Sequence, residues 1–144
     1  VEVVTPHVIE PSFGLDRTIL AILVSAYREI GEGDSMRTYL ALDPKIAPYK
    51  ICVSPLLKNK PELVGKAEEV FGMLKESFGN VVWDDNGNIG KRYRKQDEIG
   101  TPFCVVVDFE SLEDEAVTIR HRDSGEQERV KISDLEAYFS DKLK

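Results

Sequence analysis

The segment Phe103 to Asp108 constrains the fold most strongly, because it reads as an unbroken apolar strand. A strand of this kind is expected at the centre of a sheet, where both of its faces are covered. Two segments with helical periodicity precede it, residues 61–78 and 89–99, and a glycine follows each of them. Strands and helices therefore alternate, which predicts parallel strands joined by helices.

The remaining segments complete an α/β pattern. Short apolar runs at residues 49–54 and 81–83 predict two further strands. Residues 116–122 and 128–132 alternate and flank the turn Asp123-Ser124-Gly125-Glu126, which predicts an antiparallel hairpin. Ser133 and Glu136 match a capping box for a last helix. We therefore predict a mixed, mostly parallel sheet with helices on its faces.

The first third of the chain has a different pattern. Residues 8–17 read as a strand, a tight glycine turn and a helix start. Apolar residues then recur at helical spacing as far as Ile30 and lie almost all round the helix, so we expect this helix to need several packing partners. Exposed apolar surface is expected if the chain is a piece of a longer protein. We predict three parts: residues 1–35, a linker at 36–48, and a domain at 49–144.

Charge and composition exclude several classes of protein. The net charge of -7 argues against a nonspecific nucleic-acid binder, so any such role requires a local basic patch. The longest apolar run, Thr18 to Val24, is too short to span a membrane. Cys52 and Cys104 lie in Val/Ile-rich segments, which favours buried thiols over a disulfide or a metal site.

A basic patch is found in the segment Gly87 to Lys95. It contains four cations and no acid, and its glycines lie where the predicted helix begins. The four cations are Lys91, Arg92, Arg94 and Lys95. A solvated helix face and a phosphate-binding face both account for such a run. Arg120 and Arg122 share one face of a predicted strand, and beside the basic helix they would extend one surface able to contact single-stranded bases.

A second group of polar residues lies at the predicted strand-to-helix junction. Glu10 and Ser12 would be exposed at the strand end, with Arg17 in the first helical turn. A guanidinium there could bind a phosphate, helped by the helix N–H groups. By spacing alone, an internal ion pair of Arg17 with Glu10 or Asp16 explains the pattern better.

These two segments resemble parts of one enzyme family. Val8 to Arg17 resembles motif 3 of the archaeal and eukaryotic-type glycyl-tRNA synthetases. Gly87 to Tyr93, followed by Asp97 to Gly100 and the strand from Phe103, resembles the anticodon-binding domain of several class II synthetases. The second motif is shared with the enzymes for threonine, proline and histidine, whereas the first points to the glycine enzyme.

The resemblance implies roles for the named residues. Arg17 would hold the ATP phosphates, Glu10 and Ser12 would line the glycine pocket, and tRNA-Gly would be the partner. Arg92, Arg94, Lys95, Arg120 and Arg122 are the residues that we expect to contact its anticodon. The family activates glycine with ATP and Mg2+, and its members are cytoplasmic and commonly homodimeric. Motifs 1 and 2 are absent, so we expect this chain alone to be inactive and to hold no cofactor or metal.

Other functions fit the sequence less well. An accessory, non-catalytic module that reuses the synthetase scaffold is the main alternative, and Glu10, Ser12 and Arg17 argue against it. A KH domain would place the segment Gly87 to Gly90 between two helices, whereas a strand and a turn precede it here. A dinucleotide-binding enzyme would need a G-x-G-x-x-G motif after the first strand of the 49–132 region. Neither DNA nor a membrane is an expected partner.

Overall fold

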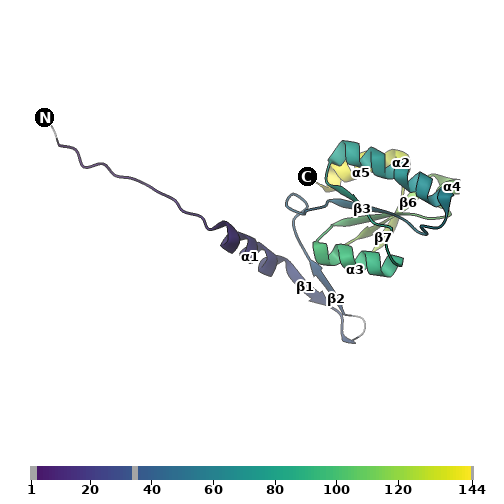
Figure 1. Ribbon diagram of the computed structural model, residues 1–144, viewed down its shortest axis with the longest axis horizontal. Coiled ribbons are helices and arrows are strands. Elements are labelled where there is room, and N and C mark those ends of the chain that lie inside the picture. Colours follow the sequence, from purple (N-terminus) through teal and green to yellow (C-terminus); the bar gives the residue numbers. More distant parts are fainter. Residues whose placement is uncertain (1–2, 34–35, 144) are drawn as a thin grey trace.

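The computed structural model describes residues 3–33 and 36–143. It has an α/β body and an N-terminal arm that projects from it (Figure 1). The arm contains α1 (Leu15–Ala26), β1 (Tyr27–Ile30) and β2 (Arg37–Leu40). The body contains β3 (Ile51–Pro55), α2 (Pro61–Phe78), β4 (Val81–Trp83), α3 (Ile89–Ile99), β5 (Phe103–Val107), α4 (Ser111–Asp114), β6 (Ala116–His121), β7 (Gln127–Lys131), a 3-10 turn (Ile132–Asp134) and α5 (Leu135–Lys142).

The body is built on a five-stranded mixed sheet, which confirms the predicted fold class. The strand order is β4-β3-β5-β6-β7. β3 pairs in parallel with both β4 and β5, whereas β5-β6 and β6-β7 are antiparallel. Every residue of β3 and β5 is buried, as their continuous apolar sequences predict.

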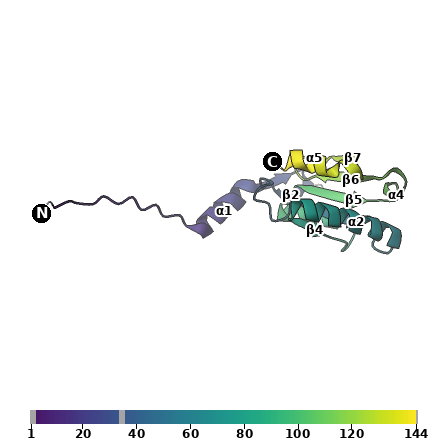
Figure 2. The same ribbon diagram turned by 90° about the horizontal axis from the view of Figure 1, so that it is seen from above.

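Helices cover the two faces of the sheet unequally. α2 and α5 lie side by side on one face, and α3 lies on the other (Figures 1 and 2). The main core fills the space between the sheet and the helix pair, with α2 and α5 contributing Leu74, Leu135 and Phe139. Phe139 is fully buried, and its ring meets those of Phe78 and Phe103 edge-to-face.

Local signals set the ends of α3 but not the start of α5. The Asn88 side chain accepts a hydrogen bond from the backbone N–H of Lys91, and Gly100 ends the helix in the left-handed conformation. The expected capping box is wrong. Ser133 donates to the Asp134 carboxylate and Glu136 accepts from Ser77 of α2, because a 3-10 turn precedes the α-helix.

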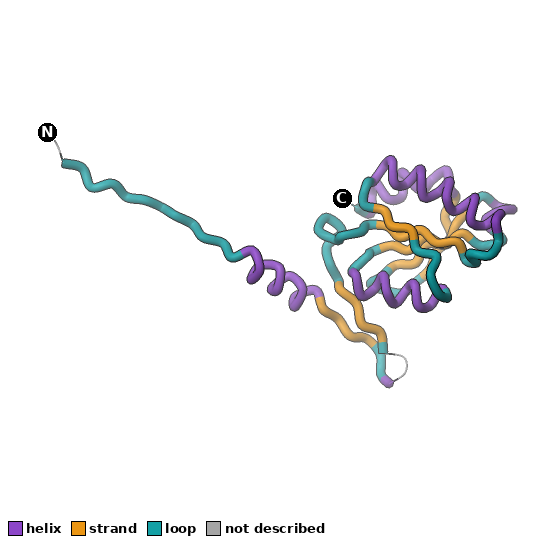
Figure 3. Tube along the Cα trace, viewed as in Figure 1, coloured by secondary structure: helices purple, strands orange, loops and turns teal. Residues whose placement is uncertain are grey.

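The arm differs most from expectation. Residues 3–14 form neither helix nor strand (Figure 3), so the predicted strand before Arg17 is wrong. The helix stops at Ala26 instead of continuing to Ile30, because residues 27–30 pair with 37–40 as an antiparallel hairpin. The region expected to be a linker, 36–48, therefore contains a strand. The three-part division of the chain itself stays a prediction.

Much of the arm's apolar surface is exposed. Ala26 is the one buried residue of α1, and Leu20 and Val24 are 62% and 69% exposed. A small second core joins Ala26 to Leu42 and Ala47 at the base of the arm. The exposed apolar surface expected for this helix is therefore present. In the described part of the chain, no helix combines the length and apolar character that crossing a membrane requires.

Removing the Phe139 ring is the sharpest test of this core. We expect Phe139→Ala to lower the free energy of unfolding by about 3–5 kcal/mol, because it leaves a cavity between α5 and the sheet. Phe13→Ala is the matched control, since Phe13 is 88% exposed, and should change stability by less than about 0.5 kcal/mol. Urea denaturation measures both. Equal effects from the two variants would contradict the described packing.

Candidate nucleic-acid interface

A buried ion pair holds α3 against the sheet. Arg120 of β6 donates two hydrogen bonds to Asp97 of α3, from Nη1 to Oδ1 and from Nη2 to Oδ2, each 2.9 Å long. Asp97 is 1% and Arg120 7% exposed. The Arg120 guanidinium also lies 4.7 Å from the centre of the Tyr93 ring. Burial of this ring raises the pKa of the Tyr93 hydroxyl to about 12.

Two other arginines of the expected RNA surface also hold parts of this chain together. Arg122 donates from Nη1 to the carbonyls of Leu42 and Gly100, so it ties the base of the arm to the end of α3. Arg92 donates to the carbonyl of Pro55 and to two carbonyls of the loop before α3. Each of these side chains is 3% exposed.

The prediction that Arg92, Arg120 and Arg122 form an exposed RNA-binding surface is therefore wrong. The physical reason is that all three guanidinium groups lie within the domain and donate to its own carbonyls and carboxylates. The alternating pattern of residues 116–122 correctly predicted that Arg120 and Arg122 share one face of the strand. It could not show that α3 and the arm cover that face.

The outer side of α3 keeps an exposed positive strip, formed by Lys91, Arg94 and Lys95. Lys95 contacts the buried carboxylate of Asp84 at 3.0 Å, while its side chain remains 56% exposed. Burial opposes ionisation of Asp84, but hydrogen bonds, chiefly from Lys95, outweigh it and lower the pKa of that carboxyl group. Lys91 and Arg94 are the strip's better candidates for binding phosphate, because neither makes a side-chain ion pair in the described structure.

A hollow of about 440 Å3 lies where β5 ends, lined by the segment that follows β5 and by residues of β6 and β7. Polar side chains of β6 and β7, among them those of Thr118, Gln127 and Arg129, line this space. A smaller hollow of about 190 Å3 shares four of its lining residues and reaches Ile89 and Tyr93 of α3. The shared residues are Leu56, Asp108, Thr118 and Gln127, and the larger hollow adds Phe109, Glu110, Glu128 and Arg129.

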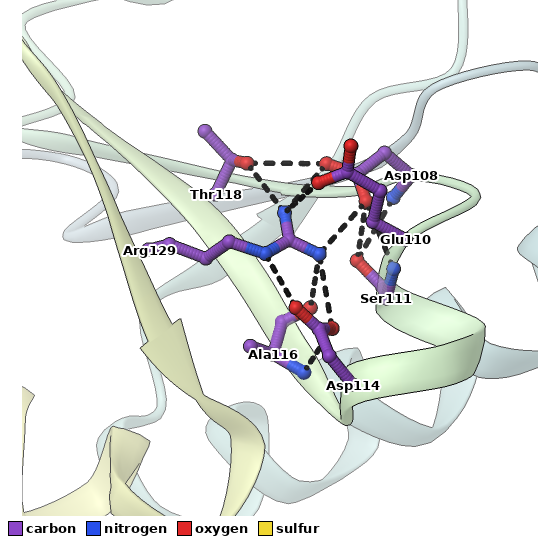
Figure 4. Close-up of polar contacts among 7 residues, drawn as sticks. All are labelled: Asp108, Glu110, Ser111, Asp114, Ala116, Thr118 and Arg129. Atoms are coloured by element: carbon purple, nitrogen blue, oxygen red, sulfur yellow. Dashed lines mark hydrogen bonds and ion pairs between the residues drawn. The ribbon is translucent and has the colours of Figure 1, made fainter.

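Arg129 is the centre of an ion-pair cluster in this hollow (Figure 4). Its Nε and Nη2 donate to Asp114 at 2.8 and 3.0 Å, and its Nη1 donates to Asp108 at 3.0 Å. The Glu110 carboxylate lies 3.9 Å from Nη1. Hydrogen bonds from Arg129 lower the pKa of Asp114. For Asp108, burial acts in the opposite sense, but hydrogen bonds from Arg129 and Ser111 outweigh it and lower the pKa.

Sequence reasoning missed the residues of this hollow. One signal was available, since Asp108 and Phe109 directly follow a buried parallel strand, and ligands commonly bind beyond the carboxyl ends of such strands. No comparable signal marked Gln127 or Arg129, which lie on an edge strand that the sequence shows only as polar.

The predicted substrate residues lie elsewhere. Glu10 and Ser12 are in the exposed segment before α1, and Arg17 is in the first turn of that helix. All three are exposed, and the segment that carries them belongs to the arm, which extends away from the α/β body (Figure 1). Their expected roles toward glycine and ATP stay predictions. The described residues also include no group of three or more His, Cys, Asp or Glu placed to bind a metal ion.

The Arg129 cluster predicts how stability depends on pH. Because their pKa values are lowered in the folded protein, Asp108 and Asp114 stabilise the fold at pH values above the ordinary Asp pKa of about 3.9. This contribution disappears as the pH falls through the pKa values of the two groups in the folded protein. We expect urea denaturation to show a steeper decrease in stability below about pH 5 for the wild type than for Arg129→Gln. Arg94→Gln, an exposed arginine without carboxylate partners, should retain the wild-type dependence. Parallel curves for all three proteins would contradict the prediction.

Comparisons with known proteins agree with this architecture. Residues 50–142 match the family described as the anticodon binding domain. Over 96% of its length the chain is 56% identical to a glycine–tRNA ligase of Lachnospira eligens, and 54% identical to one of Clostridium acetobutylicum. It spans 29% of the length of each of these relatives.

A solved structure is similar to the body. The prolyl-tRNA synthetase of Cryptosporidium parvum, complexed with L-proline and AMP, superposes with a TM-score of 0.66 at 28% identity, over 72% of this chain and 22% of that one. The family match covers the whole sheet, α3 and every residue that lines the hollow. The chain belongs to the anticodon-binding domain family.

Proposed function

We propose that this chain is the anticodon-binding part of a glycine–tRNA ligase and that it holds the anticodon loop of tRNA-Gly against α3 and the adjacent hollow. The family match over residues 50–142 carries the proposal, and the identity to glycine–tRNA ligases supports the choice of amino acid.

The charge distribution explains how an acidic chain can bind RNA. The net charge is -7, but the strip on α3 is locally positive, and it lies beside the smaller hollow, which Ile89 and Tyr93 of the same helix line. Phosphates can contact Lys91 and Arg94, with Lys95 at the edge, while bases enter the hollow. Arg94 and Lys95 thus keep the role expected from the sequence.

The arm suggests the second partner, which is the rest of the same synthetase. Its exposed apolar residues line two shallow hollows, one formed by Leu23, Val24, Tyr27 and Leu40. Surface of this kind on a chain that spans 29% of its relatives' length fits an interface with the remaining domains. Within that larger protein, Glu10 and Ser12 would face glycine and Arg17 would face ATP.

The reaction belongs to the proposed whole enzyme. That enzyme would use ATP and Mg2+ to activate glycine in the cytoplasm, and a homodimer is its expected state. This chain would contribute tRNA binding. By holding the tRNA in a fixed position relative to the catalytic domain, it would bring the reactants together, which itself accelerates the reaction.

Neutralising the positive strip tests the proposal. We expect Lys91→Gln with Arg94→Gln to weaken binding to tRNA-Gly and to reduce the salt slope of log K by about 0.7 for each phosphate that is no longer neutralised. Lys75→Gln with Lys142→Gln removes the same charge from α2 and α5, on the opposite face of the sheet, and is the matched control. Fluorescence anisotropy at several salt concentrations gives both quantities. Equal weakening in the two double variants would show that only overall charge matters.

Aminoacylation assays test whether this chain binds tRNA without catalysing the reaction. The purified chain should attach no glycine to tRNA-Gly above background, because its ATP-facing groups are not enclosed. A complete glycine–tRNA ligase from a relative serves as the positive control. Turnover by the chain alone would overturn this prediction.

A further inference from the structure

The loop between β4 and α3 contains a chemically labile dipeptide, Asn86-Gly87. We propose that Asn86 loses ammonia spontaneously and becomes aspartate or isoaspartate, and that this change weakens RNA binding by the positive strip on α3. The loss of ammonia depends only on the chemistry of this loop, whereas the effect on RNA rests on the function proposed above.

The reaction joins two adjacent residues and needs only water. The backbone nitrogen of Gly87 attacks the side-chain carbonyl carbon of Asn86 and forms an N–C bond. The side-chain amide nitrogen leaves as ammonia and takes the proton of the attacking nitrogen, so the product is a cyclic succinimide. Water then adds to either carbonyl of the ring and opens it, which gives aspartate in one case and isoaspartate in the other.

Both reacting groups are accessible. Asn86 and Gly87 are exposed. In the part of the chain that the structure describes, neither the Asn86 side chain nor the Gly87 N–H makes a hydrogen bond to another protein atom. Gly87 adopts a positive φ of 75° and has no side chain to shield its nitrogen. An exposed amide and an unprotected nucleophile therefore stand next to each other.

Two nearby asparagines lack this combination. A valine follows Asn80 and an isoleucine follows Asn88, and these branched side chains hinder approach to the backbone nitrogen. Asn88 is also held in place, since its side chain accepts a hydrogen bond of 2.9 Å from the backbone N–H of Lys91. Asn86 is therefore the asparagine of this segment that we expect to react.

A carboxylate at position 86 would lie beside the positive strip. The Lys91 side chain lies over this loop, because its Cδ is 3.7 Å from where a Cβ would stand on Gly87. A negative charge here would attract the Lys91 ammonium and repel RNA phosphates. Deamidation would thus oppose the interaction that the strip is proposed to make.

Isoaspartate would also disturb the contacts of Arg92. Nη2 of this buried side chain donates to the carbonyls on both sides of Asn86, that of Asp85 at 3.1 Å and that of Gly87 at 2.9 Å. Isoaspartate lengthens the main chain by one atom, which changes the spacing of these two carbonyls. We therefore expect isoaspartate to loosen the start of α3 in addition to adding a charge.

Mass spectrometry tests the modification. The 144-residue chain would be incubated at mildly alkaline pH, which favours loss of the proton from the attacking nitrogen, and then digested with trypsin. Residues 76–91 form one tryptic peptide that contains Asn80, Asn86 and Asn88, so the other two asparagines are internal controls. An unincubated sample corrects for deamidation during digestion. Conversion should accumulate first at Asn86, and equal conversion at every site, or none at Asn86, would overturn the proposal.

Anisotropy titrations with tRNA-Gly test the consequence. Asn86→Asp should weaken binding roughly 5-fold at low salt, and the difference should shrink as the salt concentration rises. Asn80→Asp adds the same charge before β4, at its other end, and should leave the affinity unchanged. Converted wild type, purified by ion exchange, should bind more weakly than Asn86→Asp because it contains isoaspartate. Incubated Asn86→Ser cannot form the ring and should keep the affinity of its fresh sample.

Each result decides one part of the proposal. Unchanged affinity in Asn86→Asp, or equal weakening in Asn80→Asp, would overturn the local effect on RNA binding. Equal affinities of converted wild type and Asn86→Asp would overturn the loosening of the Arg92 contacts. Failure of fresh wild type to bind tRNA-Gly at low salt would instead contradict the proposed function, and the mass spectra would still decide the modification.

Discussion

The buried carboxylate of Asp97 is the interaction on which the rest of this structure depends. It pairs with both terminal nitrogens of Arg120, and it also lies 3.4 Å from Arg37 of the arm. Removing one partner of such a pair typically costs about 3–5 kcal/mol, since the other charge is left buried. One side chain thus fastens α3 to β6 and contributes to the docking of the β1-β2 hairpin. Both the position of the positive strip and the border of the hollow follow from it.

This arrangement divides the arginines into two groups. Arg92, Arg120 and Arg122 satisfy carbonyls and carboxylates inside the domain, so they are not available for RNA. Arg94 remains in solvent on the outer side of α3. Arg129 lies between the two groups, because its donors are used internally while its plane borders a hollow. Exposure and spare hydrogen-bonding capacity, rather than charge alone, indicate which cations can take part in recognition.

The arm and the body use different kinds of contact. The body has a continuous apolar core under α2 and α5, whereas the arm meets it through a small apolar cluster and a set of charged hydrogen bonds. Arg37 donates to the carbonyls of Arg122 and Asp123, and Arg122 donates to the carbonyl of Leu42. Directional bonds of this type set an orientation more sharply than non-directional apolar contact does. The proposed interface with the remaining synthetase domains would therefore start from an arm held at a defined angle.

Local sequence patterns were enough to define the strands of the body, its helices α2, α3 and α5, and their order, because hydrophobic periodicity and glycine or asparagine at helix ends act over a few residues. They therefore predicted the mixed sheet, the limits of α3 and the burial of β5. They did not reveal the short helix α4 or the 3-10 turn before α5. The point where α1 gives way to a strand required the folded chain, since residues 27–30 need their partners at 37–40. The exposure of each cation also required the folded chain, because the burial of Arg120 depends on its contact with α3. The lining of the hollow required it too, because Asp108 and Arg129 are distant in sequence. Those contacts join segments far apart along the chain, and no local pattern encodes them.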